Sequence, residues 1–107
     1  MISRIWHGYT RPSNADAYEE LLRDEIITGI EDRLIDGFRE IQVLRRDLRD
    51  EVEFITVMWF DSMHAVRAFA GEDFDASVVP PAARKLLAHF DERSQHYEVR
   101  NRRVPKR

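Results

Sequence analysis

The chain of 107 residues contains no cysteine, and this absence excludes disulfide bonds, thiol catalysis and zinc sites built on thiolates. It also lacks any apolar run near the ~20 residues that a membrane-spanning helix needs, and it shows no apolar signal-peptide segment. These absences predict a cytoplasmic protein that makes no contact with a membrane. No repeat, linker or low-complexity segment divides the chain, so its length predicts one domain.

Charged residues are abundant, at 35% of the chain beside 43% hydrophobic residues, which is typical of a folded globular protein. The net charge of −3 includes five basic residues and no acid in the last eight positions: Arg100, Arg102, Arg103, Lys106 and Arg107. We therefore predict a domain over residues 1–100 and a flexible, solvated basic tail over 101–107. A nucleic-acid arm is the alternative, but no aromatic residue is interleaved with these charges, so no nucleic-acid partner is expected.

The segment Val52–Phe60 (VEFITVMWF) predicts a central β-strand, because it is rich in β-branched and aromatic residues and free of glycine and proline. Both of its faces are apolar, with Phe54, Met58 and Phe60 on one and Ile55, Val57 and Trp59 on the other. A strand covered on one side only would alternate apolar and polar residues, so this strand should be buried on both faces. The period changes at Asp61, the expected N-cap of a helix that ends at Gly71.

The other segments complete a β-α-β-β-α-α-β order. We expect further strands at Ile2–Thr10, Phe38–Asp47 and Arg93–Val99, and further helices at 14–28 and 81–90. Ser13 and Asp16 resemble a capping box at the start of the first helix, which Gly29 should interrupt. This order predicts an α+β fold of the ferredoxin-like split βαβ type, with a four-stranded antiparallel sheet in the order 4-1-3-2 and helices on one face.

Helices on one face would leave the other face of this sheet uncovered. Burying one large apolar side chain is worth about 1.5–3 kcal/mol, and several of them left in water form a patch typical of an interface. The sequence therefore predicts a two-fold homodimer in which a second copy covers the open face of the sheet.

Several stretches, taken in this order and at this spacing, carry a family resemblance: RIWHGYT (Arg4–Thr10), EFITVMWFDS (Glu53–Ser62), AFAGEDF (Ala68–Phe74), VVPPAAR (Val78–Arg84) and HYEV (His96–Val99). From Ile2 to Val99 the chain resembles the antibiotic biosynthesis monooxygenase (ABM) family of small dimeric α+β barrels. The resemblance implies the ferredoxin-like fold, the dimer and a pocket between the sheet and the helices of each protomer.

The resemblance also implies an activity. Members of the family include monooxygenases that oxidise anthrones or quinols with O2 and without metal or flavin, and others degrade haem. The Asn, Trp and His of the haem-degrading branch fall here at His7, Ala68 and about Val79, so haem degradation is not implied. The expected function is cofactor-independent monooxygenation of a small aromatic, phenolic or quinol substrate. The alternatives are a non-catalytic barrel that binds a hydrophobic small molecule, and a structural or regulatory dimer.

Two histidines are candidates for the base that such an oxygenase needs to deprotonate its substrate. His7, in the middle of the first strand, is the first candidate catalytic residue, and its alternative role is that of a hydrogen-bonded core histidine. His96 is the second, unless it faces solvent or the dimer seam. His64 is expected at the surface.

Five residues are candidates for substrate binding: Trp59, Tyr97, Tyr9, Phe74 and Val79. Trp59 would form a pocket wall or plain core, while Phe74 and Val79 would form a lid. Trp6 should meet the dimer partner instead. Arg39, Arg45 and Arg84 are possible anion donors.

No cofactor other than the co-substrate O2 is expected. The four histidines show no metal-binding spacing, so no metal site is predicted. The chain also contains no glycine-rich phosphate loop, so nucleotide cofactors are not expected.

Overall fold

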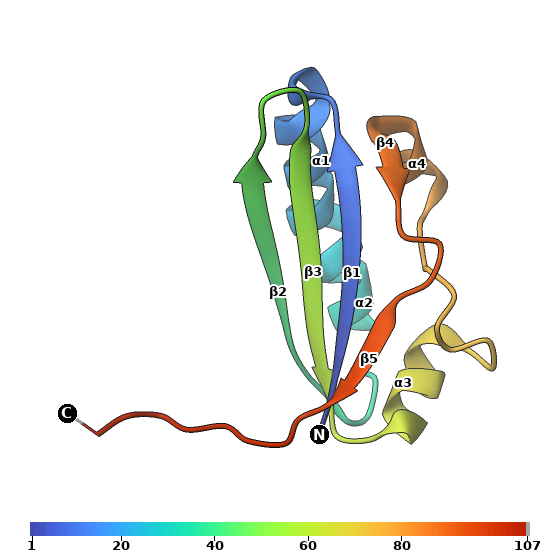
Figure 1. The fold of residues 1–107 in the computed structure, drawn as a ribbon. Helices are drawn as coiled ribbons and strands as arrows, with labels where there is room; N and C mark the ends of the chain where they lie inside the picture. The colour runs from blue at the N-terminus through green and yellow to red at the C-terminus, as the bar shows by residue number, and fades with distance from the viewer. Residues whose placement is uncertain (107) are drawn as a thin grey trace.

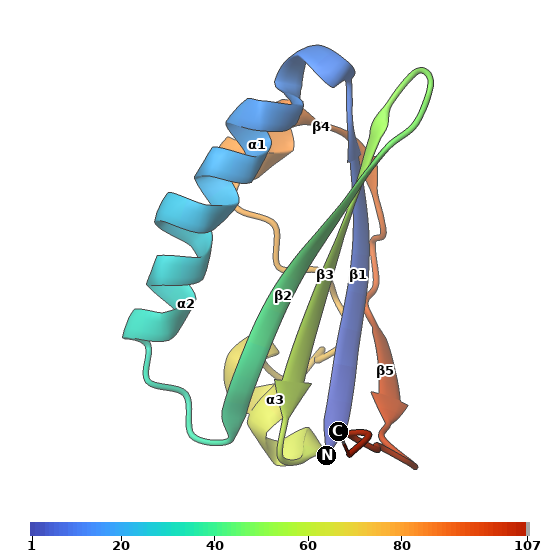
Figure 2. The same cartoon turned by 90° about the vertical axis from the view of Figure 1, so that its left-hand side faces the viewer.

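The computed structural model of the chain describes residues 1–106. It is an α+β fold in which one antiparallel sheet carries all of the α-helices on the same face (Figures 1 and 2). The strands are β1 (Ile2–Thr10), β2 (Phe38–Asp47), β3 (Val52–Phe60), β4 (Leu87–Phe90) and β5 (Gln95–Glu98). The helical segments are η1 (Pro12–Asn14), α1 (Ala15–Leu21), η2 (Leu22–Ile26), α2 (Ile27–Asp32), α3 (Met63–Ala70) and α4 (Pro81–Leu86).

The strand order β2-β3-β1 places β3 between two neighbours, so the predicted central position of Val52–Phe60 is confirmed. The three long strands begin and end at the residues that the sequence predicted. Both β4 and β5 pair with the remaining edge of β1, β5 with residues Ile2–Ile5 and β4 with residues Gly8–Thr10. The predicted order 4-1-3-2 therefore holds, but the fourth strand is divided in two and the sheet has five strands.

The helix predicted over residues 81–90 is wrong in its second half. It ends at Leu86, and Leu87 already has extended backbone angles. Residues 87–90 form β4 because the C-terminal part of β1, Gly8–Thr10, needs a partner for its backbone N–H and C=O groups. Phe90 remains on the inner side, where its ring lies 6.0 Å from that of Trp6.

The first helical region runs without a break from Ala15 to Asp32, so the predicted interruption at Gly29 is wrong. Its middle, Leu22–Ile26, is a π-helical segment, a local widening that is frequent at functional sites. The predicted capping box is also absent, since neither Ser13 nor Asp16 makes a side-chain capping bond. Within residues 1–106, no helix has the length and apolar character needed to cross a membrane.

Helix α3 begins one residue later than predicted. The hydroxyl of Ser62, not the carboxylate of Asp61, accepts the hydrogen bond from Ala65 N at 3.4 Å. Asp61 instead binds Arg39, whose Nε donates to it at 2.6 Å. Gly71, with φ of +90°, ends α3 as the sequence predicted.

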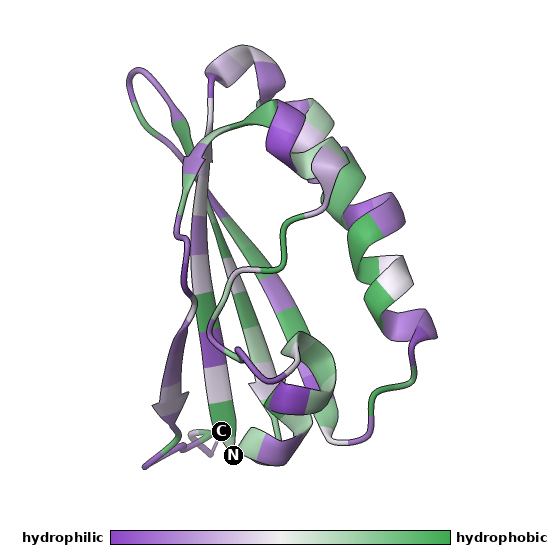
Figure 3. Ribbon diagram, turned by 90° about the vertical axis from the view of Figure 1, so that its right-hand side faces the viewer, coloured by the Kyte–Doolittle hydropathy of each residue, from purple (hydrophilic) through white to green (hydrophobic). Residues whose placement is uncertain are grey.

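The two faces of the sheet have different surroundings, and Figure 3 shows sheet and helices as two layers. The helix-covered face holds Phe54, Met58 and Phe60 of β3, which are almost fully buried in two core clusters. The open face holds Ile55, Val57 and Trp59 of the same strand, which stay partly exposed. The sheet is therefore apolar on both sides, but one chain covers only one of them.

The basic tail leaves the domain after β5 and runs away from the sheet (Figure 1). Val99 N donates to Met1 O at 2.9 Å, and residues 100–106 beyond this bond are exposed. Arg107, the last residue of the predicted tail, lies outside the described residues. The predicted flexibility of this tail stays a prediction.

Candidate functional site

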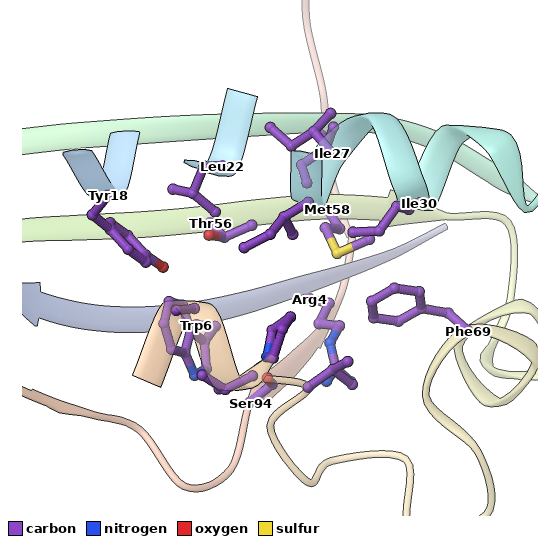
Figure 4. Close-up of a pocket in the computed structure, with 16 residues that line it drawn as sticks. Arg4, Trp6, Tyr18, Leu22, Ile27, Ile30, Thr56, Met58, Phe69 and Ser94 are labelled. Atoms are coloured by element: carbon purple, nitrogen blue, oxygen red, sulfur yellow. The ribbon is translucent and has the colours of Figure 1, made fainter. Parts of the chain in front are cut away.

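A small apolar cavity lies between the helix-covered face of the sheet and the long helical region (Figure 4). Strands β1 and β3 form its floor, the helical region forms its roof, and Val78–Pro80 closes one side. Its volume is about 60 Å³, which is about two waters' share of the liquid. The π-helical segment contributes Leu22 and Ile26 to the roof. The cavity occupies the position that the family resemblance implies for a pocket.

Trp6 forms one wall of this cavity. Its indole Nε1 donates to Ser77 Oγ at 3.0 Å and to Asp91 O at 2.9 Å, which fixes the orientation of the ring. Gly8 makes this orientation possible, because a Cβ at that position would come within 2.5 Å of the ring. The expectation that Trp6 meets a dimer partner is therefore wrong, since this side chain faces the helices.

Arg4 is the charged side chain at the cavity, and only 3% of its surface is exposed. Its Nη1 donates to Phe74 O at 2.5 Å and its Nη2 to Ala76 O at 3.1 Å, which ties the segment before α4 to β1. Nη1 also lies 3.0 Å from Nε2 of His96. The guanidinium stacks on the ring of Phe69, with Cζ 5.3 Å from the ring centroid.

The charge of Arg4 has no carboxylate partner among the described residues. The nearby acids Asp73 and Asp75 bind Arg93 instead, at 2.8 and 2.5 Å. Burial lowers the pKa of Arg4 to about 10, against the field of Asp75. Because this value lies far above neutral pH, the guanidinium keeps its charge. Buried charges are normally paired, so an unpaired one at a cavity indicates a site that receives negative charge.

His96 stands beside this cation on the same face of the sheet. Since Arg4 has no acceptor, Nε2 of His96 must accept the hydrogen bond, and the ring is then neutral with its proton on Nδ1. Burial lowers the pKa of His96, and the charge of Arg4 lowers it further. The edge of Phe74 packs against the ring, with centroids 5.5 Å apart. His96 is therefore held neutral, with its one unprotonated nitrogen directed at Arg4.

Tyr18 supplies a further polar group of the cavity, whose lining also includes Thr56 and Ser94. Only 1% of its surface is exposed, and its ring packs edge-on against Phe54 with centroids 4.9 Å apart. Figure 4 shows its hydroxyl pointing into the cavity. This hydroxyl forms no hydrogen bond within residues 1–106, and its oxygen is not fully enclosed, because Thr10 Oγ1 is the one enclosed side-chain oxygen or nitrogen without a partner there. Burial raises the pKa of Tyr18, so the hydroxyl keeps its proton and is available as a donor.

Four of the predicted site residues lie on the open face of the sheet and do not line this cavity: His7, Tyr9, Trp59 and Tyr97. Placing them with the pocket was wrong. The alternation of β1 turns residues 4, 6, 8 and 10 toward the helices and residues 3, 5, 7 and 9 away from them. Residues of β3 and β5 that pair with β1 lie on the same face of the sheet as their partners.

These open-face residues have other partners. Nδ1 of His7 lies 2.8 Å from the carboxylate of Asp91, which also accepts from Gln95 at 3.2 Å. Tyr9 stacks on His89 with centroids 4.3 Å apart, and its hydroxyl donates to Glu53 at 3.0 Å. His7 is therefore a hydrogen-bonded histidine of the uncovered side, with the sheet between it and the cavity.

The other predicted residues, His96, Phe74 and Val79, lie on the cavity side: Val79 lines the cavity, and His96 and Phe74 contact Arg4. Three residues of the site were missed: Arg4, Trp6 and Tyr18. A signal for Arg4 was present, because it stands between Ile2 and Trp6 on one face of a strand predicted to be central.

The arginines that the sequence offered as anion donors lie elsewhere. Arg39 binds Asp61, Arg45 binds three carboxylates, and Arg84 donates to Val79 O at 3.2 Å. None of the three lines the cavity. Within residues 1–106, no group of three or more His, Asp or Glu side chains gathers in a way that could hold a metal ion.

No family model and no curated protein matches the chain, but solved structures match its fold. A Bacillus cereus protein provisionally described as an antibiotic biosynthesis monooxygenase has 16% sequence identity and a TM-score of 0.67, and the match covers 97% of each chain. Rv0793 from Mycobacterium tuberculosis has 18% identity and a TM-score of 0.60, covering 96% of this chain and 98% of that one.

A third similar structure is the monooxygenase from the gene ActVA-Orf6 of Streptomyces coelicolor, in complex with the ligand nanaomycin D. It has 16% identity and a TM-score of 0.63, and the match covers 98% of this chain and 92% of that one. At such identities the likeness concerns the fold. The resemblance seen in the sequence is thus confirmed at that level: the chain has the ferredoxin-like α+β fold of the antibiotic biosynthesis monooxygenase structures.

Proposed function

We propose that the protein is a cofactor-independent monooxygenase of the ABM type that oxidises a small phenolic or quinol substrate with O2 in the cavity above β1. The observation that carries this proposal is the buried guanidinium of Arg4, without a carboxylate partner among the described residues, at a mostly apolar cavity. The fold shared with the Streptomyces coelicolor monooxygenase supports it, since that structure holds the ligand nanaomycin D.

The chemistry requires that the substrate lose a proton and become electron-rich enough to reduce O2. The anion passes one electron to O2, and the two radicals combine into a peroxide on carbon. Loss of water then converts a CH2 group and O2 into a C=O group and H2O. Apolar walls such as Trp6 and Phe69 keep water from the intermediates, and Arg4 stabilises the anion.

Of the two histidines predicted to be catalytic, His96 takes the role of the base in this proposal. It is neutral, and it stands on the cavity side next to Arg4, which lines the cavity. To act as the base, its Nε2 exchanges the contact with Arg4 Nη1, at 3.0 Å, for the proton of the substrate, and the freed guanidinium N–H then holds the anion formed. His7 is separated from the cavity by the sheet, so it has no direct path to a substrate there.

An aromatic substrate needs more room than the cavity offers. A cavity of about 150 Å³ holds benzene, whereas this one measures about 60 Å³. The segment Val78–Pro80 is the movable side, because it belongs to the connection between α3 and α4. Figure 3 shows a hydrophobic stretch of this connection just before α4. We infer that it swings outward to admit a ring, which agrees with the predicted lid role of Val79.

The test is O2 uptake by the purified protein with anthrones and hydroquinones, without added cofactor and with a chelator present. We expect turnover in the wild type, at least a tenfold loss in His96→Gln, and unchanged turnover in His64→Gln, whose position lies on α3 outside the cavity lining. Turnover that survives in His96→Gln and vanishes in His7→Ala would refute the base assignment. An absence of uptake with every substrate would refute the proposal.

The second candidate function is a non-catalytic barrel that binds a hydrophobic small molecule. The lining of the cavity favours it, because most lining residues are apolar side chains such as Leu22, Met58 and Ile30. Binding of the same aromatic compounds without O2 uptake would support this function over catalysis.

The homodimer predicted from the sequence also remains a proposal. The partly exposed apolar residues of the open face support it, since Ile5 of β1 pairs there with Val57 of β3, and Ile55 lies two residues before Val57 on the same face.

A further inference from the structure

We propose that the cavity takes a small planar aromatic carboxylate, whose carboxylate binds in a fork to Nε and Nη2 of Arg4 and whose opposite end carries an oxygen that accepts from Tyr18. This inference rests on the proposed function, because it names the substrate class of the same cavity. Its binding step can nevertheless be measured without turnover.

The donors of Arg4 indicate where a carboxylate fits. A guanidinium has five N–H groups, and three of them are directed at Phe74 O, Ala76 O and His96 Nε2. Both hydrogens of Nη1 are thereby used, and Nη2 uses one. What remains is the N–H of Nε and one N–H of Nη2, for which residues 1–106 provide no acceptor. Nε and Nη2 form one edge of the guanidinium, which matches the two oxygens of a carboxylate.

The local charge also favours an anionic ligand. Arg4 is 3% exposed and forms no ion pair within the described residues, while the acids nearest to it bind Arg93. His96, its side-chain neighbour, is neutral and adds no negative charge. A carboxylate entering the cavity therefore neutralises a charge that the fold leaves uncompensated.

Tyr18 is an independent observation from another element. Tyr18 belongs to α1 and only 1% of its surface is exposed. Its hydroxyl points into the cavity and forms no hydrogen bond within residues 1–106 (Figure 4). A neutral donor without an acceptor at a cavity fits a ligand oxygen such as a phenol or a quinone carbonyl. Because Tyr18 packs on Phe54, which pairs with Gly8, it stands at the level of Gly8.

The distance between these two groups calls for an elongated ligand. A strand rises ~3.3 Å per residue, so the levels of Gly8 and Arg4 are ~13 Å apart, and the side chain of Tyr18 spans part of this distance. Trp6 lies between them on β1, and Thr56, which pairs with it on β3, also lines the cavity. The indole of Trp6 therefore offers a flat apolar surface between the two polar groups, which suits an aromatic ring.

The experiment measures binding by calorimetry without oxygen, using 6-hydroxy-2-naphthoate, its carboxamide, and 2-naphthoate. The carboxylate should bind the wild type at least tenfold more tightly than the amide. Arg4→Gln should remove this preference, and Tyr18→Phe should weaken the hydroxynaphthoate by about fivefold without affecting 2-naphthoate. Equal affinities of carboxylate and amide in the wild type would overturn the proposal.

Arg33→Gln is the matched control. Arg33 stacks on the same ring as Arg4, with Cζ 5.4 Å from the centroid of Phe69, but it donates to carbonyls of α3 and lies outside the cavity lining. The carboxylate preference should survive this substitution. Its loss in Arg33→Gln to the same degree as in Arg4→Gln would mean a general effect of positive charge and would refute the site.

A measurement on the wild type guards against a folding defect in Arg4→Gln. In nitrogen-15 NMR spectra, the Nε–H signal of Arg4 should move downfield with the naphthoate and stay in place with the amide. An unmoved signal under saturating naphthoate would refute the fork.

The two proposals fail separately. If the naphthoates bind as described but no substrate gives O2 uptake, the carboxylate site is supported and the monooxygenase activity is refuted. If neutral quinols are turned over while the carboxylate and the amide bind equally, the monooxygenase activity is supported and the carboxylate site is refuted.

Discussion

Thr10 is a buried residue whose polar atom the fold leaves unsatisfied. The side chain is fully buried at the end of β1, and its Oγ1 has no hydrogen-bond partner among the described residues. Unlike Tyr18, it does not line the cavity. Since an unpaired buried hydroxyl costs about 1–3 kcal/mol, Thr10→Val should raise the free energy of unfolding by roughly 1 kcal/mol in urea titrations. Thr28→Val, at an exposed position, is the control and should change little. A destabilised Thr10→Val would contradict this account.

His96 should make stability depend on pH. Burial and the charge of Arg4 lower the pKa of His96 in the folded state, so the unfolded chain binds its proton more readily. The stability that this residue contributes is therefore complete above the ordinary histidine pKa of about 6.5 and is lost as the pH falls below it. Urea unfolding at pH 7.5 and 5.5 should show a smaller drop for His96→Gln, which keeps an acceptor for Arg4 but does not titrate. Equal drops would assign the loss to other groups, such as Asp73, whose pKa is lowered by its hydrogen bond from Arg93.

At the scale of the element, two glycines should respond oppositely to alanine. Gly29 lies inside α2, and nothing stands within 4 Å of a Cβ placed there, so Gly29→Ala should stabilise the protein by about 0.5–1 kcal/mol. Gly71 ends α3 with φ of +90° and ψ of −171°, a region essentially restricted to glycine, so Gly71→Ala should cost about 1–3 kcal/mol. Thermal unfolding of both variants provides the measurement. A gain at Gly71 would contradict the cap geometry.

Helices and strands were predictable from the sequence where the local residue types favour a single structure. The strand at Val52–Phe60 contains only strand-forming residues, and Gly71 is a clear stop for a helix. The segment Leu87–Phe90 was not predictable, because its apolar spacing continues that of α4 and only the need of β1 for a partner overrides it. The interruption predicted at Gly29 failed for the same reason: tertiary packing keeps the helix continuous through a residue of low helix propensity.

The candidate site was predicted on the wrong face because both faces of the central strands are apolar. The sequence shows that His7 and Trp6 lie on opposite sides of β1, but not which side the helices cover. Arg4 is visible as a charge within a central strand. The orientation of Tyr18 and its lack of a partner belong to the tertiary structure alone, because its spacing is that of any core residue of α1.

At the scale of the whole molecule, the apolar open face of the sheet is the feature on which the proposed homodimer depends. Val57 lies near its centre, where it pairs with Ile5 on one side and with Gln42 on the other. If a second copy covers this face about a two-fold axis, Val57→Lys places two like charges against each other in a buried seam. The variant should then be monomeric, while the cavity on the other face of the sheet keeps its ligand.

The oligomeric state is measured by light scattering at about 10 μM, because interfaces of standard size have dissociation constants from micromolar to picomolar. The wild type should be a dimer, and Val57→Lys should be a monomer with native circular dichroism. The control Leu34→Lys, which changes a side chain that is 87% exposed, should remain a dimer. Calorimetry with the same aromatic ligands should then give similar affinities for the wild type and Val57→Lys, because helix and sheet of one chain enclose the cavity. A monomeric wild type would refute the dimer proposal without affecting the proposal for the cavity. Loss of binding together with the dimer would instead mean that the partner holds the sheet in shape, so that the open face would act on the cavity through β1 and β3.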